Sequence, residues 1–430
     1  MTIYIEPYSD VGRREARLAG ETITFLNFMK SPFSMEGVLV LFVFSGIFKQ
    51  AKGFAELVPF DATVFLGVIL IALLARAVRH GQFPLSRYSF AALSALLVLL
   101  SVMAFSVFWS PSIKYATQKL LYLMTFSPLT FFATMYAATD RRRIRNLALT
   151  LVFFTSIADI VLLHLLIIAP KALWFLGLLS GGYQATSYFF GLGLVSAMTF
   201  IIFSSLKPNV LAFFMIYFAS SFFVLLQTGG AGGLLGLALG AVFLAGTAIV
   251  QRFWYQEKLR PGAIWLGFGA VLIALYLTYL FSTDALPTSL ARILEKISGN
   301  GIAPYDERLN RFSWSLEVWS QSPLIGAGLG AWPVYLGLGD TEEYAHNIFL
   351  ELLSEQGIVG GILLTGFIGT LIVTWIKSKG KIPADVRNFA MAIFIFGMSN
   401  ALVSGQFSTM RMLWLSFGML LLVPPHLRDP

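Results

Sequence analysis

The sequence predicts an all-α polytopic membrane protein with about twelve transmembrane helices and one long outer loop that carries short amphipathic helices. Of its 430 residues, 57% are hydrophobic and only 12% are charged, whereas soluble domains carry about 25% charged residues. The apolar residues also come in blocks of about 20, the length that crosses a ~30 Å hydrocarbon core as a helix. Because these blocks are continuously apolar rather than alternating, they exclude a transmembrane β-barrel.

The apolar blocks predict twelve spans in three parts of the chain. The predicted spans are 33–48, 57–78, 88–109, 116–138, 146–168, 184–206, 208–227, 231–250, 262–282, 356–376, 388–403 and 408–423. Nine belong to an N-terminal bundle, 1–282, and three to a C-terminal part, 356–430. The one long connection is 283–355, and long structured loops are usually functional. The polar segment 1–20 lacks the apolar run of a cleaved signal peptide.

The basic residues predict how these spans are oriented. With the N-terminus inside, most of the 30 Lys and Arg residues fall in connections on the inner side, including the run "DRRRIR" at 140–145. Positive charge of this kind marks cytoplasmic loops. Both termini are therefore expected in the cytoplasm and the long loop on the outer face. The net charge of +8 then reflects topology determinants near anionic lipid, and no nucleic-acid partner is expected.

The first candidate functional element of the long loop is a predicted helix that carries two arginines one turn apart. The stretch "YDERLNRFSWSLEVWSQSP" is typical of a short helix that ends at Pro323. Its apolar residues share one face at 100° per residue: Leu309, Phe312, Leu316 and Trp319. Such a helix would lie flat on the bundle at headgroup depth. On its flank, Arg308 and Arg311 suit a diphosphate through bidentate forks, but they equally suit lipid phosphate, and the spacing leaves both interpretations open.

Two glycine-rich stretches flank this chemistry. "PLIGAGLGAWP" at 323–333 has no strand before it and no acidic residue at the right distance after it, so a dinucleotide site is not expected. We expect its glycines to let the backbone turn tightly against the bundle. "LLQTGGAGGLLGLALG" at 225–240 is typical of close helix packing. At its start, Gln227 and Thr228 offer polar groups that can hydrogen-bond a ligand.

The stretch "DTEEYAHNIFLELLSEQGIVGG" places His346 and Asn347 at the first turn of a predicted helix, with Gly357 allowing a break further on. The chain contains no cysteine, and no second His or Cys stands at ligand spacing from His346, so no zinc site is expected. A solitary histidine can accept or donate a proton near neutral pH. Taken alone, however, His346 is better explained as a capping or interfacial polar group at the end of a helix.

The combination of these motifs resembles the O-antigen ligase and Wzy-type polysaccharide polymerase superfamily. The resemblance rests on "NRFSWSLEVWSQSPLIGAGLGAW" followed by "YAHNIFLELLSEQGIVGGILL". The matching positions are Arg311, Trp314, Pro323, Gly326, Gly328, His346, Asn347, Leu350, Glu351, Glu355, Gly357 and Gly360. The motif covers about 50 residues, and the twelve-span topology agrees over most of the chain.

The resemblance implies a GT-C-like, metal-independent glycosyltransferase without a cofactor. Members take a glycan from undecaprenyl diphosphate at the outer face of the bacterial inner membrane and transfer it to another sugar with inversion. Carried over by position, Arg311, with Arg308 beside it, would bind the diphosphate leaving group. His346 would act as the base toward the acceptor hydroxyl or as a further phosphate contact. Cations can neutralise a diphosphate without a general acid, whereas the hydroxyl must be made nucleophilic.

The chain departs from the family pattern where it reads "TGGAGG", because many relatives carry Ser-Arg there. The missing arginine, near Gly230, leaves a role that Arg411 or Lys119 would fill. We therefore list the further candidate substrate-binding residues as Lys114, Lys119, Gln227, Asn347 and Arg411. The departure favours a repeat-unit polymerase for exopolysaccharide or O-antigen over a ligase that joins polymer to lipid A–core.

Several partners follow from this interpretation: the lipid-linked glycan donor, a glycan or lipid A–core acceptor and the membrane lipids, with a chain-length regulator as a further candidate. A non-catalytic transporter of lipid-linked glycan is the alternative from another class. A transporter would carry charges or an acidic relay deep in the bundle. Asp159 is the clearest intramembrane acid, and the other polar groups concentrate in the outer loop, which favours the enzyme.

Overall fold

The computed structural model describes residues 25–49, 61–82, 87–168, 183–204, 206–255, 261–283, 304–379 and 382–422, with a few single positions between 287 and 294. All regular elements in these ranges are helices, which confirms the predicted fold class. The predicted absence of a signal peptide concerns residues outside them. The elements that matter below are α2 (Phe25–Lys30), α3 (Met35–Lys49), α5 (Ala62–Arg79), α6 (Arg87–Phe105), α7 (Lys114–Met124), α8 (Phe126–Ala137), α9 (Arg141–Ile168), α11 (Tyr183–Phe203), α12 (Pro208–Gln227), α13 (Ala231–Tyr255), α14 (Pro261–Ser282), α16 (Pro304–Gln321), α17 (Trp332–Tyr335), α18 (Ile348–Lys377), α19 (Ala384–Ser404) and α20 (Arg411–Met419).

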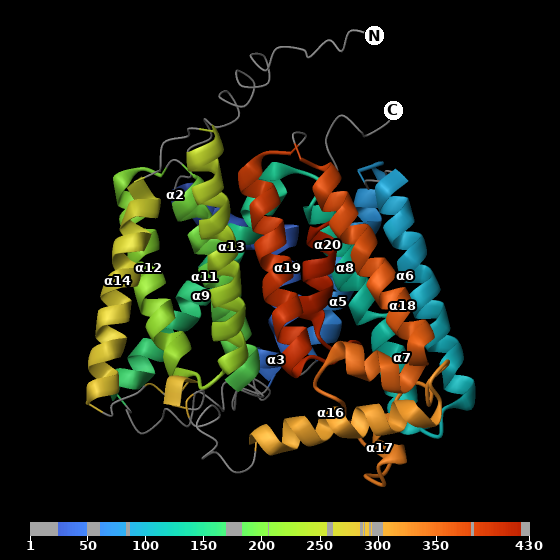
Figure 1. Cartoon of the computed structure of the whole chain (residues 1–430). Helices are drawn as coiled ribbons and strands as arrows, with labels where there is room; N and C mark the ends of the chain where they lie inside the picture. Colours follow the sequence, from blue (N-terminus) through green and yellow to red (C-terminus); the bar gives the residue numbers. More distant parts are fainter. Residues whose placement is uncertain are drawn as a thin grey trace, which may run out of the picture.

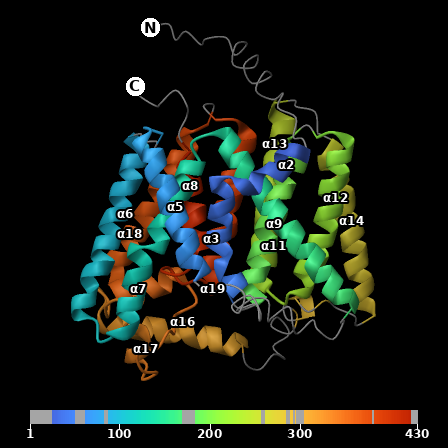
Figure 2. The ribbon, with the colours of Figure 1, turned by 180° about the vertical axis from the view of Figure 1, so that it is seen from behind.

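Most of these helices stand side by side as an upright bundle, and α16 lies across one end of it (Figure 1). We call the end that carries α16, α17 and the start of α18 the motif face. The opposite end, which carries α2, is the far face (Figures 1 and 2). The predicted flat helix of the long loop is thus present and crosses the ends of the upright helices.

Each predicted span contains a helix. In the described residues, nine helical stretches are long and apolar enough to cross a membrane, which makes the chain a multi-pass membrane protein. The last predicted span, 408–423, is shorter than expected, because α20 has only 9 residues. It is buried among other helices rather than exposed to lipid: Trp414 packs edge-on against Phe131 of α8, and Phe417 packs against Phe367 of α18.

The glycines of the motif loop, by which we mean residues 322–347 between α16 and α18, behave as predicted. Gly326, Gly328 and Gly330 all have positive φ, a conformation that side chains disfavour. A Cβ added at Gly328 would lie 2.6 Å from Ser110 Cα, so the loop backbone presses directly on the segment before α7. Gly357, with φ of 64°, interrupts the helical geometry of α18 and separates a short first part from the long span, as the sequence predicted.

The glycines of α13 serve helix packing, also as predicted. A Cβ at Gly232 or Gly236 would lie 2.5 and 2.6 Å from the side-chain amide of Asn400 in α19. At Gly230, a side chain would collide with the hydroxyl of Ser187 in α11. An arginine therefore has no room at this position in the present packing, which gives a physical reason for the departure from the family pattern.

The long-loop helix α16 differs from prediction in the face it turns to the protein. Its apolar residues Leu309 and Leu316 are each 47% exposed. The buried positions are instead Arg311, Ser315 and Val318. Ser315 accepts a hydrogen bond from the indole of Trp332 at 2.9 Å. The prediction was wrong because periodicity identified the apolar stripe but not the polar contacts that dock the helix.

Candidate active site

A cavity of about 560 Å³ opens among α3, α11 and the connection between α19 and α20. Its volume lies in the range typical of small-ligand sites. Apolar residues form about half of the lining, and the phenol, amide and hydroxyl groups in it belong to Tyr183, Gln184, Tyr188, Tyr344, Ser404, Gln406 and Thr409. Tyr344 comes from the motif loop, so the predicted loop and the bundle meet at this cavity.

Arg411 is the one charged residue among the described residues that line the cavity. Its guanidinium donates to the carbonyl of Phe42 and to Ser45 Oγ, the latter at 2.8 Å. It also lies over the Phe42 ring, 5.1 Å from the centroid. No described carboxylate is within ion-pair distance of Arg411, although the charge of Asp61 acts on it from farther away.

Arg308 approaches the cavity from α16. Its charge acts on the phenols of Tyr188 and Tyr344, both of which line the cavity. Within the described part of the chain, Arg308 makes no ion pair. Arg308 is not itself a lining residue, whereas Arg411 is, so Arg308 acts on the cavity through the two tyrosines.

Arg311 is placed differently. Its Nη1 forms an ion pair with Glu343 Oε2 at 2.7 Å and donates to the carbonyl of Tyr344 at 3.0 Å. The guanidinium lies over the ring of Trp332, 5.6 Å from its centroid. Arg311 is nearly buried and holds the motif loop against α16, which makes it a structural contact of the segment that leads to His346.

His346 has a φ of 56°, the one positive φ among the described non-glycine residues. Side chains pay a free-energy cost in this left-handed region, and such residues cluster at functional sites. The His346 ring packs against the Tyr344 ring at 4.3 Å between centroids. Burial raises the pKa of the Tyr344 phenol to about 12, so the phenol keeps its proton near neutral pH and can donate a hydrogen bond.

Asn347 caps α18. Its side-chain oxygen accepts from the backbone N–H groups of Phe349 and Leu350 at 3.0 and 3.1 Å. Its amide nitrogen donates to the carbonyl of Leu402 at the end of α19. The amide of this predicted substrate-binding residue is thus engaged in holding α18 to α19.

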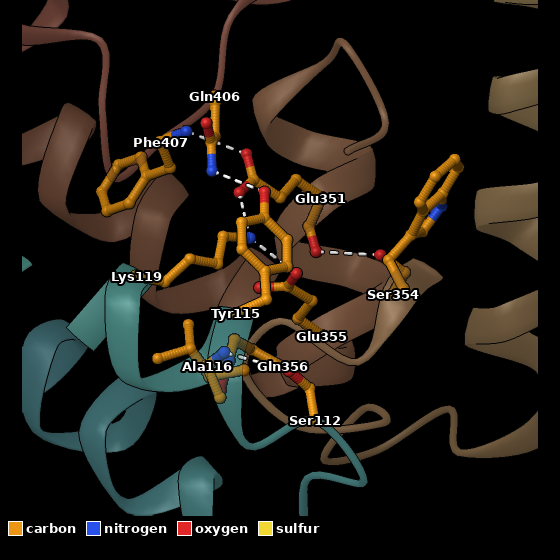
Figure 3. A network of polar contacts seen from close by, with 12 residues as sticks. Ser112, Tyr115, Ala116, Lys119, Glu351, Ser354, Glu355, Gln356, Gln406 and Phe407 are labelled. Carbon is orange, nitrogen blue, oxygen red and sulfur yellow. Dashed lines mark hydrogen bonds and ion pairs between the residues drawn. The ribbon is translucent and has the colours of Figure 1, made fainter. Parts of the chain in front are cut away.

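The remaining predicted substrate-binding residues lie apart from the cavity lining. Lys114 is exposed at the start of α7, and Gln227 is the last residue of α12. Lys119 is buried and forms ion pairs with Glu351 at 2.5 Å and with Glu355 at 2.6 Å. Its charge is therefore matched inside the protein (Figure 3).

Asp340 fastens the motif loop to α7. Its carboxylate accepts from Ser112 Oγ at 2.7 Å and from three backbone N–H groups at the start of α7, those of Ile113, Lys114 and Tyr115. Partial burial raises the pKa of Asp340, but these hydrogen bonds outweigh it and lower the pKa to about 2. The ionised carboxylate also complements the positive end of the α7 dipole.

Among the described residues, no group of His, Cys, Asp and Glu is arranged to hold a metal ion.

Sequence reasoning missed the aromatic and amide lining of the cavity. Tyr188, Gln184 and Gln406 carry no motif of their own and come from α11 and the α19–α20 connection. Sequence reasoning also missed the buried pairing of Lys119 with Glu351, which are 232 positions apart. The one available signal was a lysine inside a predicted span, because such a charge needs a partner; the two glutamates lie just before the predicted span 356–376.

The comparisons with known proteins agree with the motifs. Residues 216–365 match the family model Wzy_C, described as O-Antigen ligase. That range runs from α12 through α16 and His346 into α18. No curated protein matches the chain. The match covers about a third of the chain, and over this part the chain is similar to the O-antigen ligase family.

Proposed function

We propose that the chain transfers a glycan from undecaprenyl diphosphate to a hydroxyl of an acceptor sugar, with inversion and without a metal ion. The observation that carries the proposal is the cavity whose lining combines one guanidinium outside any described ion pair, Arg411, with phenol, amide and hydroxyl groups. A diphosphate needs cations, and a sugar needs hydrogen-bonding and aromatic surfaces. One cavity offers both.

The cations account for the leaving group. When the bond between the anomeric carbon and the diphosphate oxygen breaks, negative charge grows on that oxygen. Arg411 lines the cavity, and Arg308 acts on the same two tyrosines from the side of α16. Preorganised cations at developing charge are usually the largest contribution to such catalysis. Arg311 would contribute by holding the loop, or directly if a phosphate displaced Glu343.

The acceptor hydroxyl must lose its proton as it attacks the opposite face of the anomeric carbon. We assign this proton to His346, whose ring packs against Tyr344, a residue that lines the cavity. A neutral imidazole accepts a proton near pH 7. The left-handed backbone of His346 fits a residue held in place for a task, because the strain has no benefit to folding.

We propose that the protein acts in the bacterial inner membrane, with both termini cytoplasmic and the motif face toward the periplasm. The described connections with several basic residues support this orientation. Arg76 and Arg79 end α5, and Arg141 and Arg143 begin α9, at the far face together with α2 (Figure 2). Positive charge of this kind marks the cytoplasmic side.

Within the family, we propose repeat-unit polymerisation rather than ligation to lipid A–core. The support is the departure at Gly230, where the packing against Ser187 leaves no room for the arginine of many relatives. The two activities differ in acceptor: a polymerase extends a glycan on the lipid carrier, and a ligase transfers finished polymer to lipid A–core.

The test is complementation in a strain that lacks the native gene. Wild type, His346→Ala and the control His80→Ala are expressed at equal levels; His80 is an exposed histidine that follows α5 at the far face. We expect His346→Ala to lose high-molecular-weight polysaccharide and the control to retain it. Undiminished polymer with His346→Ala would refute the assignment. Polymer on lipid A–core alone, with chain lengthening intact in the deletion strain, would identify a ligase.

A further inference from the structure

Two carboxylates and one ammonium are buried together beneath the cavity. Lys119 of α7 pairs with Glu351 and Glu355 of α18, and each of these side chains is at most 2% exposed. Burying charges is costly, and removing one partner of such a group leaves an uncompensated charge. Figure 3 shows the three side chains converging from α7 and α18. The cluster therefore fixes α7 against the first part of α18.

Only one of the two glutamates makes a hydrogen bond to the turn that carries cavity-lining residues. Glu351 Oε2 accepts the backbone N–H of Phe407 at 2.8 Å, in the turn between α19 and α20 (Figure 3). Glu355 bonds Lys119 through Oε1 and makes no hydrogen bond to that turn. The two glutamates lie one helical turn apart and share Lys119, but Glu351 reaches the α19–α20 turn, whereas Glu355 accepts from the backbone of Gly330.

The turn reached by Glu351 carries the cavity lining. Gln406, Thr409 and Arg411 all belong to the stretch 404–412 that lines the cavity. Other contacts hold the same turn: Gln406 Nε2 donates to Tyr115 Oη at 2.7 Å, and the indole of Trp414 donates to the Phe407 carbonyl at 2.8 Å. The N–H of Phe407 is buried, and an ionised carboxylate is a strong acceptor for it.

We propose that Glu351 is a positioning residue for donor binding. Through the Phe407 N–H it sets the α19–α20 turn, and with it Gln406 and Arg411, at the cavity, while Lys119 and Glu355 hold Glu351 in place. The inference rests on the proposed function in that the cavity binds the lipid-linked donor. It adds that the buried cluster acts on donor affinity and not only on folding.

The matched pair Glu351→Gln and Glu355→Gln tests this. Each variant leaves Lys119 one carboxylate and changes the charge equally, but only Glu351→Gln weakens the acceptor at Phe407. In proteoliposomes, we expect Glu351→Gln to raise KM for a lipid-linked oligosaccharide about tenfold with a smaller change in kcat, and Glu355→Gln to stay within about twofold. Equal kinetics for the two variants, or a fall in kcat with KM unchanged, would overturn the proposal.

A second arm does not depend on activity. The chain has no cysteine, so Thr409→Cys introduces a single thiol at the exposed edge of the turn. We expect its modification rate by a water-soluble maleimide to change with Glu351→Gln and not with Glu355→Gln. An unchanged rate in both would overturn the positioning role, even if the protein proved to have another activity. Loss of activity in His346→Ala is judged separately and bears on the proposed function alone.

A third variant covers the case in which a single substitution fails to fold. The triple change Lys119→Met, Glu351→Gln and Glu355→Gln removes every charge of the cluster, and neutral replacements of buried ion groups are often tolerated. We expect the triple variant to fold and to show the raised KM of Glu351→Gln. A folded triple variant with the wild-type KM would contradict the proposal.

Discussion

Two arginines of this protein, Arg311 and Arg411, illustrate the difference between matching a motif and being available to a ligand. Arg311 belongs to the family motif, yet its guanidinium already holds Glu343 at 2.7 Å and lies over Trp332. Arg411 belongs to no motif, yet it lines the cavity and has no described carboxylate beside it. A guanidinium that is paired must release its carboxylate before it can bind phosphate, whereas Arg411 needs no exchange.

The largest effect is expected for Arg411→Ala. Loss of one charge-assisted contact costs about 2–3 kcal/mol, so we expect kcat/KM for the lipid-linked donor to fall roughly 100-fold. Arg411→Lys keeps the charge but loses the planar fork, and its activity should lie between the two. Steady-state kinetics in proteoliposomes measure both. An Arg411→Ala enzyme with activity near wild type would show that the guanidinium serves packing against Phe42.

Arg311 should give a smaller effect through the loop. Arg311→Ala removes the ion pair with Glu343 and the bond to the Tyr344 carbonyl, and we expect a loss of about tenfold in kcat/KM. Glu343→Gln distinguishes the two possible roles of Arg311. If Arg311 only holds the loop, the variant loses activity; if Glu343 competes with phosphate for Arg311, the variant gains donor affinity. Measuring KM for Arg311→Ala, Glu343→Gln and the double variant separates the two roles.

The positive φ of His346 predicts that two inactive variants at this position differ in stability. Glycine adopts φ of 56° freely, so His346→Gly should be more stable than His346→Ala by about 1 kcal/mol. Both variants should be inactive in polysaccharide synthesis. Thermal unfolding in detergent compares them. Equal stability of the two would mean that the left-handed backbone is not kept once the imidazole is removed.

The smallest effect is expected at Asp340. Because its folded pKa is depressed to about 2, its contribution to stability is complete above the ordinary carboxyl pKa near 4 and is lost as the pH falls from there toward 2. Asp340→Asn should lower stability near neutral pH by roughly 0.5–1 kcal/mol, the size of a helix cap. The gap between wild type and variant in Tm should narrow between about pH 5 and pH 3. A gap that stays constant over this range would exclude the ionised cap.

Much of the architecture followed from the sequence, because apolar blocks of membrane length and positive φ at glycines are local properties. The spans, the break at Gly357 and the packing role of the α13 glycines are of this kind. The features that differ from prediction depend on contacts between distant segments. The length of α20 depends on its burial among α8, α18 and α19, and the docked side of α16 depends on Arg311 meeting Glu343.

The candidate site likewise combines local motif residues, which the sequence identified, with contacts between distant segments, which it did not. The motif identified His346 and the arginines of α16 as residues of one loop. It could not indicate that Asn347 is engaged as a cap, that Lys119 is neutralised by Glu351, or that the α19–α20 turn supplies the cavity wall. Each of these depends on segments far apart in sequence that only the folded bundle brings together.

We propose that Arg411, rather than Arg311, is the principal cation for the diphosphate. The most direct measurement is equilibrium binding of undecaprenyl diphosphate, with and without its glycan, to purified wild type, Arg411→Ala and Arg311→Ala. We predict that Arg411→Ala raises the Kd of both lipids roughly 100-fold and that Arg311→Ala raises it less than tenfold. A larger loss for Arg311→Ala than for Arg411→Ala would contradict the account.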